Sequence, residues 1–350
     1  MMISAASGFI NQAEKYSRDN AGKSLKKYTL LRKGELAYNH GASKVKPYGC
    51  CFELLETEAR IPYVYHCFKI SDKYSTSYIA KYLNNSKIDA YLKKIVSSSV
   101  RMDGLLNISY EDYTDVILRV PSLIEQQKIA DFLSLIDKRI EKQRQLVESL
   151  KKYKRGYLKA LIKKLNTTEF LLENIVEEYQ NKTILNMQYP ILSSTMNGIK
   201  LQDDYFNKQA ASENTIGYKI VPKGYFTYRS MSDTGVFRFN RQMLVGNGIV
   251  SPAYPVFKVK SEEANPIFVE YMLNEDDKIK EQLLTQKEGG TRYALSFSKF
   301  KSLKINLPDI NIQEKIAIQI TLLNTLVKKQ EAYLHCLNKN KCGLLQQMFI

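Results

Sequence analysis

The sequence contains an internal repeat, and this repeat limits the possible folds more than any other feature. The segment KGELAY at residues 33–38 recurs as KGYFTY at residues 223–228, and FKI at residues 68–70 recurs as FKV at residues 257–259. The segment PSLIEQQKIA at residues 121–130 recurs as PDINIQEKIA at residues 308–317. A chain of 350 residues has room for two domains, since one domain usually holds about 100–200 residues. The repeat therefore predicts two similar domains, each followed by the same kind of segment.

The segments that follow Pro121 and Pro308 have the pattern of long helices. Ser122 and Glu125 form a capping-box pattern, and Asp309 is the N-cap candidate of the second segment. Apolar residues then recur with heptad spacing, which is typical of a coiled coil. The predicted seam consists of Ile129, Leu133, Ile136, Ile140, Val147 and Leu150 in the first helix, and of Ile316, Ile320, Leu323, Val327, Leu334 and Leu337 in the second.

Polar residues interrupt the two heptad patterns at the same positions. Gln143 is equivalent to Gln330, and Lys154 is equivalent to Lys341. Two interpretations of these polar residues remain open. They either fix the register of the helices at a cost in stability, or they merely tolerate solvent at these positions. Because the chain leaves one domain along each helix, we expect the helices to be antiparallel. The remaining faces are expected to be basic, since residues 121–165 carry 12 Lys or Arg and five Asp or Glu.

The parts between the helices have mixed character. Short runs of Tyr, Phe and Val broken by Gly, Pro and Asn indicate strands, and residues 77–96 and 266–284 are expected to be helical. We therefore predict an α+β fold with two pseudo-two-fold-related domains, residues 1–120 and 166–307, separated by two long antiparallel coiled-coil helices, residues 121–165 and 308–350. The first repeat lacks a counterpart of residues 168–190, so the first strand of its domain is expected to be missing.

The charge and the cysteines limit the class of protein. The chain carries 52 Lys and Arg against 36 Asp and Glu, which gives a net charge of +16 and indicates a polyanionic partner, with nucleic acid first and an anionic membrane surface second. We expect no membrane span, because no apolar run approaches about 20 residues. Five cysteines at irregular spacing predict reduced thiols in a cytoplasmic protein, and no zinc-ligand spacing is present, so no metal site is expected.

The duplicated unit resembles the specificity subunits of type I restriction–modification systems. The resemblance covers nearly the whole chain and is carried by the pattern P-x-x-x-E-Q-x-x-I-A at Pro121, Glu125, Gln126, Ile129 and Ala130, by its weaker copy after Pro308, and by the heptads. It implies two target recognition domains that bind the halves of a bipartite site in double-stranded DNA, with the helices setting the gap. It also implies docking of two modification (methyltransferase) subunits and of restriction subunits. This chain would have no catalytic residue and no cofactor, and S-adenosylmethionine, ATP and Mg would be bound by the partner subunits.

Candidate DNA-binding residues lie in polar loops of both domains, because base edges and phosphates are contacted by Arg, Lys, Asn, Ser and Tyr. They are Asn39, His40, Lys44, Lys46, Tyr48 and Arg101 in the first domain, and Arg229, Ser230, Arg238, Asn240, Arg241, Arg292 and Tyr293 in the second. Arg101 and Arg292 are the strongest candidates because they recur in both repeats.

Two other classes of function remain open at this stage. A self-contained DNA methyltransferase or nuclease is suggested only by fragments: Gly22-Lys23-Ser24 lacks the first glycine of a P-loop, and Asn265-Pro266-Ile267-Phe268 is better explained as a helix N-terminus. A non-catalytic coiled-coil adaptor would use the basic charge only for solubility.

Overall fold

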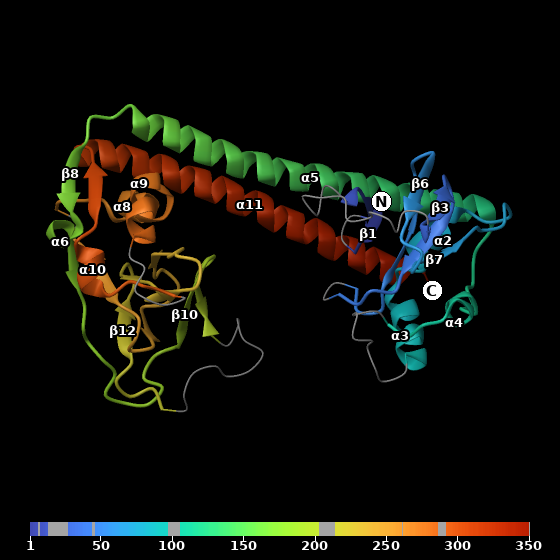
Figure 1. The fold of residues 1–350 in the computed structure, drawn as a ribbon, viewed down its shortest axis with the longest axis horizontal. Coiled ribbons are helices and arrows are strands. Elements are labelled where there is room, and N and C mark those ends of the chain that lie inside the picture. Colours follow the sequence, from blue (N-terminus) through green and yellow to red (C-terminus); the bar gives the residue numbers. More distant parts are fainter. Residues whose placement is uncertain are drawn as a thin grey trace. The chain divides into compact units, whose positions relative to one another are not determined.

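The computed structural model describes residues 1–5, 8–12, 27–43, 46–96, 106–202, 214–260, 262–285 and 292–349. The chain forms two compact units (Figure 1): unit 1 is Met1–Glu148 with Lys329–Ile350, and unit 2 is Ser149–Lys328. The long helices α5 (Leu123–Lys163) and α11 (Ile310–Met348) contribute to both units. The predicted domain boundaries stay a prediction, since each compact unit combines a globular part with parts of both helices.

The globular part of unit 1, as far as it is described, forms two antiparallel strand pairs, one three-stranded sheet and three short helices. Its elements are β1 (Met2–Ser4), β2 (Gly8–Ile10), β3 (Thr29–Arg32), β4 (Leu36–Asn39), β5 (Cys50–Glu53), β6 (Glu58–Ile61), β7 (His66–Phe68), α2 (Thr76–Tyr82), α3 (Ser86–Ile95) and α4 (Tyr110–Thr114). Strand β1 pairs with β2, β3 pairs with β6, and the third sheet has the antiparallel order β5-β4-β7. The core includes Leu36, Tyr38 and Tyr78, which are almost fully buried.

Unit 2 repeats this plan and adds further strands. Its elements are β8 (Thr168–Leu171), α6 (Leu172–Ile175), β9 (Val176–Glu178), β10 (Leu192–Thr195), β11 (Gly198–Leu201), β12 (Lys219–Pro222), β13 (Phe226–Thr227), β14 (Met231–Ser232), β15 (Asn240–Arg241), β16 (Asn247–Val250), β17 (Val256–Val259), α8 (Pro266–Glu275), α9 (Asp277–Leu284), β18 (Tyr293–Ala294), α10 (Phe297–Lys301) and β19 (Lys304–Leu307). The pairs β10-β11 and β12-β16 correspond to β1-β2 and β3-β6. The central sheet has the order β15-β13-β17-β9 and so carries one strand more than its counterpart in unit 1.

The structure confirms the predicted α+β class and the two stretches expected to be helical, and it shows that each stretch is divided. Residues 77–96 and 266–284 are not single helices: each stretch is two short helices, α2 with α3 and α8 with α9. Asn85 interrupts the first pair because its side chain caps α3, and Asp276 caps α9 in the same way. The turn glycines Gly34 and Gly224 both have positive φ, which explains why the repeat keeps glycine at these two positions.

Both long helices begin as their sequences predict. The Ser122 hydroxyl accepts a hydrogen bond from the Glu125 backbone N–H at 3.4 Å, and the Glu125 carboxylate accepts one from the Ser122 N–H at 3.1 Å. Asp309 accepts one from the Asn311 N–H at 2.9 Å. These contacts satisfy N–H groups that have no partner within the helix.

A buried glutamine joins each long helix to the globular part beside it. Gln126 and Gln313, equivalent in the repeat, are both 1% exposed. Each donates its amide N–H to the carbonyl oxygen of the proline five residues earlier, at 2.8 Å. Each side-chain oxygen also accepts a backbone N–H at 3.0 Å, from Ser75 and from Asn265 respectively. We call this arrangement the glutamine bridge; it explains why the glutamine of the repeated motif occurs in both copies.

Ser75 and Asn265, the residues that the bridges contact, are themselves the N-caps of α2 and α8. Each bridge therefore fixes the start of a long helix against the start of a domain helix. The direct consequence is that a globular part cannot rotate about its long helix without breaking the hydrogen bond between the buried glutamine and the N-cap residue of the domain helix.

The long helices pack antiparallel within each unit, side by side in Figure 1 (α5 in green, α11 in red). In unit 1, Gln143 donates to the Gln330 side-chain oxygen at 2.8 Å, so the two equivalent glutamines bind each other. In unit 2, Lys154 donates to Asn324 at 2.9 Å. Its repeat equivalent Lys341 forms an ion pair with Asp137 at 2.6 Å. The polar interruptions are thus matched across the seam.

The predicted seam residues are buried or half-buried in the structure. Leu133, Ile140 and Val147 of α5 and Ile316, Ile320 and Val327 of α11 are buried, and the six other predicted positions are half-buried. Burial of a Leu, Ile or Val side chain contributes about 1.5–3 kcal/mol, so these residues dominate the helix contact.

The outer faces of the long helices carry exposed apolar side chains in addition to exposed lysines and arginines. Apolar side chains on these faces are exposed: Phe132, Leu135, Leu146 and Tyr153 on α5, and Ile318, Leu322 and Leu326 on α11. Phe132, Leu146 and Tyr153 belong to one heptad column, in which Arg139 occupies the remaining position. The heptad spacing of this second column is visible in the sequence, beside the columns that form the seam.

Candidate nucleic-acid interface

Four of the predicted DNA-binding residues lie on or next to a two-stranded ribbon of unit 2. Strand β14 pairs antiparallel with β18, with Met231 opposite Ala294 and Ser232 opposite Tyr293, so Arg229 and Ser230 lie at one end of the ribbon and Arg292 lies at the other. The Leu295 N–H donates to the Ser230 carbonyl at 2.8 Å and extends the pairing. Because these residues come from segments about 60 positions apart, only the fold joins them.

The charged groups of this ribbon face solvent. Arg229 is exposed. Arg292 is also exposed and forms an ion pair with Asp233 at 2.7 Å. An exposed ion pair contributes little to stability, so the Arg292 guanidinium can exchange Asp233 for another anion at small cost. The sequence analysis missed Asp233, since a single aspartate in a polar loop gives no signal of its own.

Three further predicted residues of unit 2 are engaged within the protein. Asn240 is 4% exposed, and its amide donates to the Ser194 hydroxyl and the Thr195 carbonyl, both at 2.8 Å. Arg238 forms an ion pair with Glu275 at 3.2 Å, and Arg241 forms one with Glu270 at 3.3 Å. These three side chains attach β15 and the loop before it to β10 and α8.

The ion pair between Arg241 and Glu270 is partly buried, and this burial affects the Glu270 carboxyl. Burial raises its pKa above the usual value, and the guanidiniums of Arg241 and Arg238 offset only part of that effect. Release of Arg241 toward a phosphate would leave a half-buried carboxylate behind, which is unfavourable. Arg238 and Arg241 are therefore weaker candidates for DNA contact than Arg229 and Arg292.

The predicted residues of unit 1 lie at the end of β4 and in the loop that follows it. The Asn39 side chain donates to the Ile3 carbonyl at 3.3 Å and accepts from the Gly41 N–H at 2.9 Å. Lys46 is half-buried and donates to the Asn84 carbonyl at 2.6 Å. The carbonyl of Tyr48 accepts a hydrogen bond from the Tyr38 hydroxyl at 2.5 Å. Their polar groups stabilise the loop itself.

His40 belongs to a buried aromatic group. It is 6% exposed and packs edge-on against His66, with ring centroids 4.9 Å apart, while Tyr38 stacks on Tyr113 at 3.7 Å. Burial raises the pKa of the Tyr38 hydroxyl, which keeps it neutral and available as a donor. Lys44 and Arg101 lie outside the described residues.

The motif fragments that suggested an enzyme have structural explanations where the structure describes them. Asn265 is the N-cap of α8: its side chain accepts from the N–H groups of Ile267 and Phe268 at 3.0 and 3.2 Å, and Pro266 occupies the first turn. Gly22-Lys23-Ser24 lies outside the described residues. Across the described part of the chain, no group of three His, Cys, Asp or Glu side chains is placed to hold a metal ion. Within the same ranges, no helix has the length and hydropathy to cross a bilayer.

Comparisons with known proteins agree with this architecture. Residues 162–332 match the family model described as the type I restriction modification DNA specificity domain. Among curated proteins, no sequence matches the chain. A chain from a study of complex assembly and conformational transition of the type I R-M system is similar in fold, with a TM-score of 0.54 and 13% identity, over 92% of this chain and 83% of that one.

A second solved structure shares the fold over a similar extent. The S subunit of the type I restriction-modification system from M. genitalium has a TM-score of 0.52 and 15% identity, over 93% of this chain and 85% of that one. At such low identity these likenesses concern the fold alone. The comparisons thus show that residues 162–332 match a type I restriction modification DNA specificity domain and that about nine-tenths of the chain share the fold of these solved structures.

Proposed function

We propose that this chain recognises DNA as the non-catalytic specificity subunit of a type I restriction–modification complex. Its globular parts, residues 1–120 and 166–307, would each bind one half of a bipartite site in double-stranded DNA. The net charge of +16 suits a polyanionic ligand. The observation that carries the proposal is the ribbon β14-β18 of unit 2, which has an exposed arginine at each end, Arg229 next to Ser230 and Arg292 next to Tyr293, within the part of the chain that matches a DNA specificity domain.

The two arginines have the chemistry that DNA recognition requires. A guanidinium binds two acceptors at once, on a guanine edge or on a phosphate, and a two-stranded ribbon is narrow enough for the major groove. Ser230 and Tyr293 add a hydroxyl group beside each arginine in the sequence. We therefore propose Arg229 and Arg292 as the principal DNA contacts of unit 2, with Arg238 and Arg241 in supporting positions.

The exposed faces of the long helices support docking of partner subunits. On α5, Phe132, Leu146 and Tyr153 offer exposed apolar contacts in one heptad column, and on α11, Ile318, Leu322 and Leu326 offer them at four-residue spacing. Helices of another chain can pack on such columns. We propose that two modification subunits dock on these faces and that restriction subunits join the assembly. S-adenosylmethionine, ATP and Mg would be bound by those partners.

The proposal is tested by selection from a randomised duplex pool, with the chain assembled with its modification subunits. We expect a bipartite motif with a fixed gap. Arg229→Ala and Arg292→Ala should each alter one half of the motif and leave the other half unchanged. Lys278→Ala removes one exposed positive charge from the same unit and should leave the motif unchanged.

Two outcomes contradict the proposal. If only non-specific, salt-sensitive binding is found, the chain is a basic protein without sequence recognition. If the purified chain alone methylates or cleaves DNA, it is an enzyme and not a specificity subunit.

A further inference from the structure

The ribbon β14-β18 of unit 2 turns one row of side chains toward solvent. Successive residues of a strand project to opposite faces, and residues that lie opposite each other in an antiparallel pair project to the same face. Arg229, Met231 and Asp233 are exposed, whereas Ser230 and Ser232 between them are half-buried. This alternation places the three exposed residues on one face of the ribbon, here called the outer face.

The second strand adds Ala294 and Arg292 to the outer face. Ala294 lies opposite Met231, and the same register continued by two residues places Arg292 opposite Asp233. The ion pair between Arg292 and Asp233 at 2.7 Å agrees with this placement. Met231 therefore lies between the two exposed arginines, two residues from Arg229 on its own strand and diagonally across the pair from Arg292.

The other face of the ribbon is held on the core of unit 2. Leu295 is fully buried, its N–H donates to the Ser230 carbonyl, and its own carbonyl accepts a hydrogen bond from the Tyr228 hydroxyl at 3.3 Å. Gly235 packs against the ring of Tyr293, because a Cβ atom at this position would lie 3.2 Å from Tyr293 Cε1. The outer face thus rests on a fixed support, and a ligand meets its side chains in a defined order.

Met231 is an apolar side chain at a place where a polar one would be expected. It is 49% exposed, and the small side chain of Ala294 opposite leaves it accessible. A single exposed apolar residue is ordinary on a protein surface. Met231 differs from such residues because it lies between two arginines that we propose as DNA contacts. Its unbranched, polarizable side chain can adapt to a small apolar group.

The apolar group that double-stranded DNA offers at this kind of surface is the C5-methyl group of thymine. In the major groove, guanine presents two acceptors that suit a guanidinium, and thymine presents a methyl group that suits an apolar side chain. Neither a phosphate nor the edge of a cytosine offers such a group. An arginine, a methionine and an arginine in succession therefore match a succession of bases.

The dimensions of the ribbon agree with those of the groove. Two residues along an antiparallel strand span about 6.8 Å. Two steps along one strand of the duplex also span about 6.8 Å. The major groove admits a two-stranded ribbon. A ribbon that lies along the groove thus brings Met231 to a base pair between those that Arg229 and Arg292 contact.

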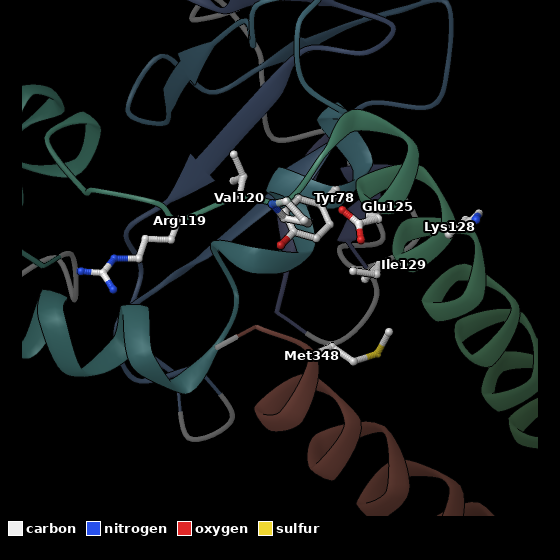
Figure 2. Close-up of a pocket in the computed structure, with 8 residues that line it drawn as sticks. Tyr78, Arg119, Val120, Glu125, Lys128, Ile129 and Met348 are labelled. Carbon is white, nitrogen blue, oxygen red and sulfur yellow. The ribbon is translucent and has the colours of Figure 1, made fainter.

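The cavity of unit 1 offers a different chemistry. It has a volume of about 540 Å³, and its lining includes Tyr78 of α2, Glu125 and Ile129 of α5 and Met348 of α11. Figure 2 shows the charged ends of Arg119 and Lys128, which also line it, on opposite sides of the view. The Glu125 carboxylate is already bound in the capping box of α5. These residues do not place an apolar contact between two outward donors, as the ribbon does.

We propose that Met231 is a specificity-determining residue, which contacts the C5-methyl group of a thymine in the half-site that unit 2 binds. This thymine lies between the bases that Arg229 and Arg292 contact, so Met231 selects an A·T pair there. The inference rests on the proposed function, and it adds the chemical group that one position of the half-site must carry.

The test uses the full chain assembled with its modification subunits. Selection from a randomised duplex pool gives the motif, and the half that Arg292→Ala alters is the half bound by unit 2. Each thymine of this half, on either strand, is then replaced by uracil, which lacks only the C5-methyl group. We expect uracil to weaken binding about three- to fivefold at one position, between those that Arg229→Ala and Arg292→Ala affect, because the contact of one methyl group is lost.

Met231→Gln keeps the length of the side chain and makes it polar. This variant should bind the thymine and uracil duplexes equally and should keep the preferences at the positions of the two arginines. Met243 provides a matched control, since it is 48% exposed and lies in unit 2 outside the ribbon. Met243→Gln should retain the difference between thymine and uracil. Because both methionines are exposed, neither variant should change the midpoint of urea unfolding.

Three results overturn the inference and leave the proposed function intact, because a bipartite motif is present in each. The first is a half-site without an A·T pair between the two arginine positions. The second is equal affinity of the unchanged chain for the thymine and uracil duplexes. The third is a difference between these duplexes that persists in Met231→Gln. If no motif is selected, the proposed function itself fails, and the inference fails with it.

Discussion

The glutamine bridge is the most sharply testable contact in the structure. Gln313 is buried and makes two hydrogen bonds, one to the Pro308 carbonyl and one from the Asn265 N–H. Gln313→Ala removes both and leaves one backbone acceptor and one backbone donor buried without their partner. Each such group costs about 1–3 kcal/mol. Since a water molecule can restore part of the loss, we expect unit 2 to lose about 2–4 kcal/mol of unfolding free energy.

The repeat provides an internal comparison for this value. Gln126→Ala breaks the same two contacts in unit 1, so its cost should agree with that of Gln313→Ala within about 1 kcal/mol. Glu314 is the neighbour of Gln313 and is exposed, so Glu314→Ala should change the free energy by less than about 0.5 kcal/mol.

Urea unfolding monitored by hydrogen exchange measures this difference, because the protection of α8 amides reports on unit 2 and that of α2 amides reports on unit 1. Gln313→Ala should lower protection in α8 and leave protection in α2 unchanged. If both alanine variants cost less than about 0.5 kcal/mol, the bridge does not hold the helices as we argue, and the explanation of the repeated motif fails.

Three further variants test other parts of the structure. Asp137 has a pKa below its usual value, because its two lysine partners outweigh the effect of burial. Its contribution to stability is therefore present above the unfolded-state pKa and is lost as the pH falls through the folded-state pKa. Asp137→Asn should abolish this part of the pH dependence of thermal unfolding. Gln143→Leu alone should destabilise the chain more than the double variant Gln143→Leu with Gln330→Leu, because the double variant removes both polar partners. A double-mutant cycle that shows no coupling energy between the two positions would mean that the pair is not formed. Gly248→Ala would place a Cβ atom 2.3 Å from Leu192 Cδ1, so we expect about 1–3 kcal/mol of destabilisation in chemical unfolding, and an unchanged midpoint would refute the close packing.

The antiparallel pairing also contains an asymmetry that the repeat brings out. Lys341 faces Asp137, whereas the equivalent Lys154 faces Asn324, the equivalent of Asp137. The same contact is therefore an ion pair in unit 1 and a hydrogen bond from a lysine to a neutral amide in unit 2. Asp137 also binds Lys81 of α2 at 2.9 Å, so in unit 1 the carboxylate joins both long helices to a domain helix.

The interface residues could be predicted only in part. Arg229, Ser230, Arg292 and Tyr293 were singled out as polar loop residues, and the structure places them on one ribbon. Asn240 was singled out for the same reason and is buried. Residue type and loop composition give the same signal for a side chain that faces solvent and for one that fastens a loop, so only packing separates the two.

The sequence by itself determined the duplication, the two long helices, their seam and the α+β class. These features follow from local and periodic patterns: a helix with heptad spacing must bury its apolar column wherever it lies, and equal segments fold in equal ways. Two features follow only from the tertiary structure: which polar residues are buried, and that equivalent glutamines bridge a long helix to the domain helix. These depend on contacts between residues far apart in the chain, such as Gln313 with Asn265 or Leu172 with Leu303, and no local pattern encodes such a contact.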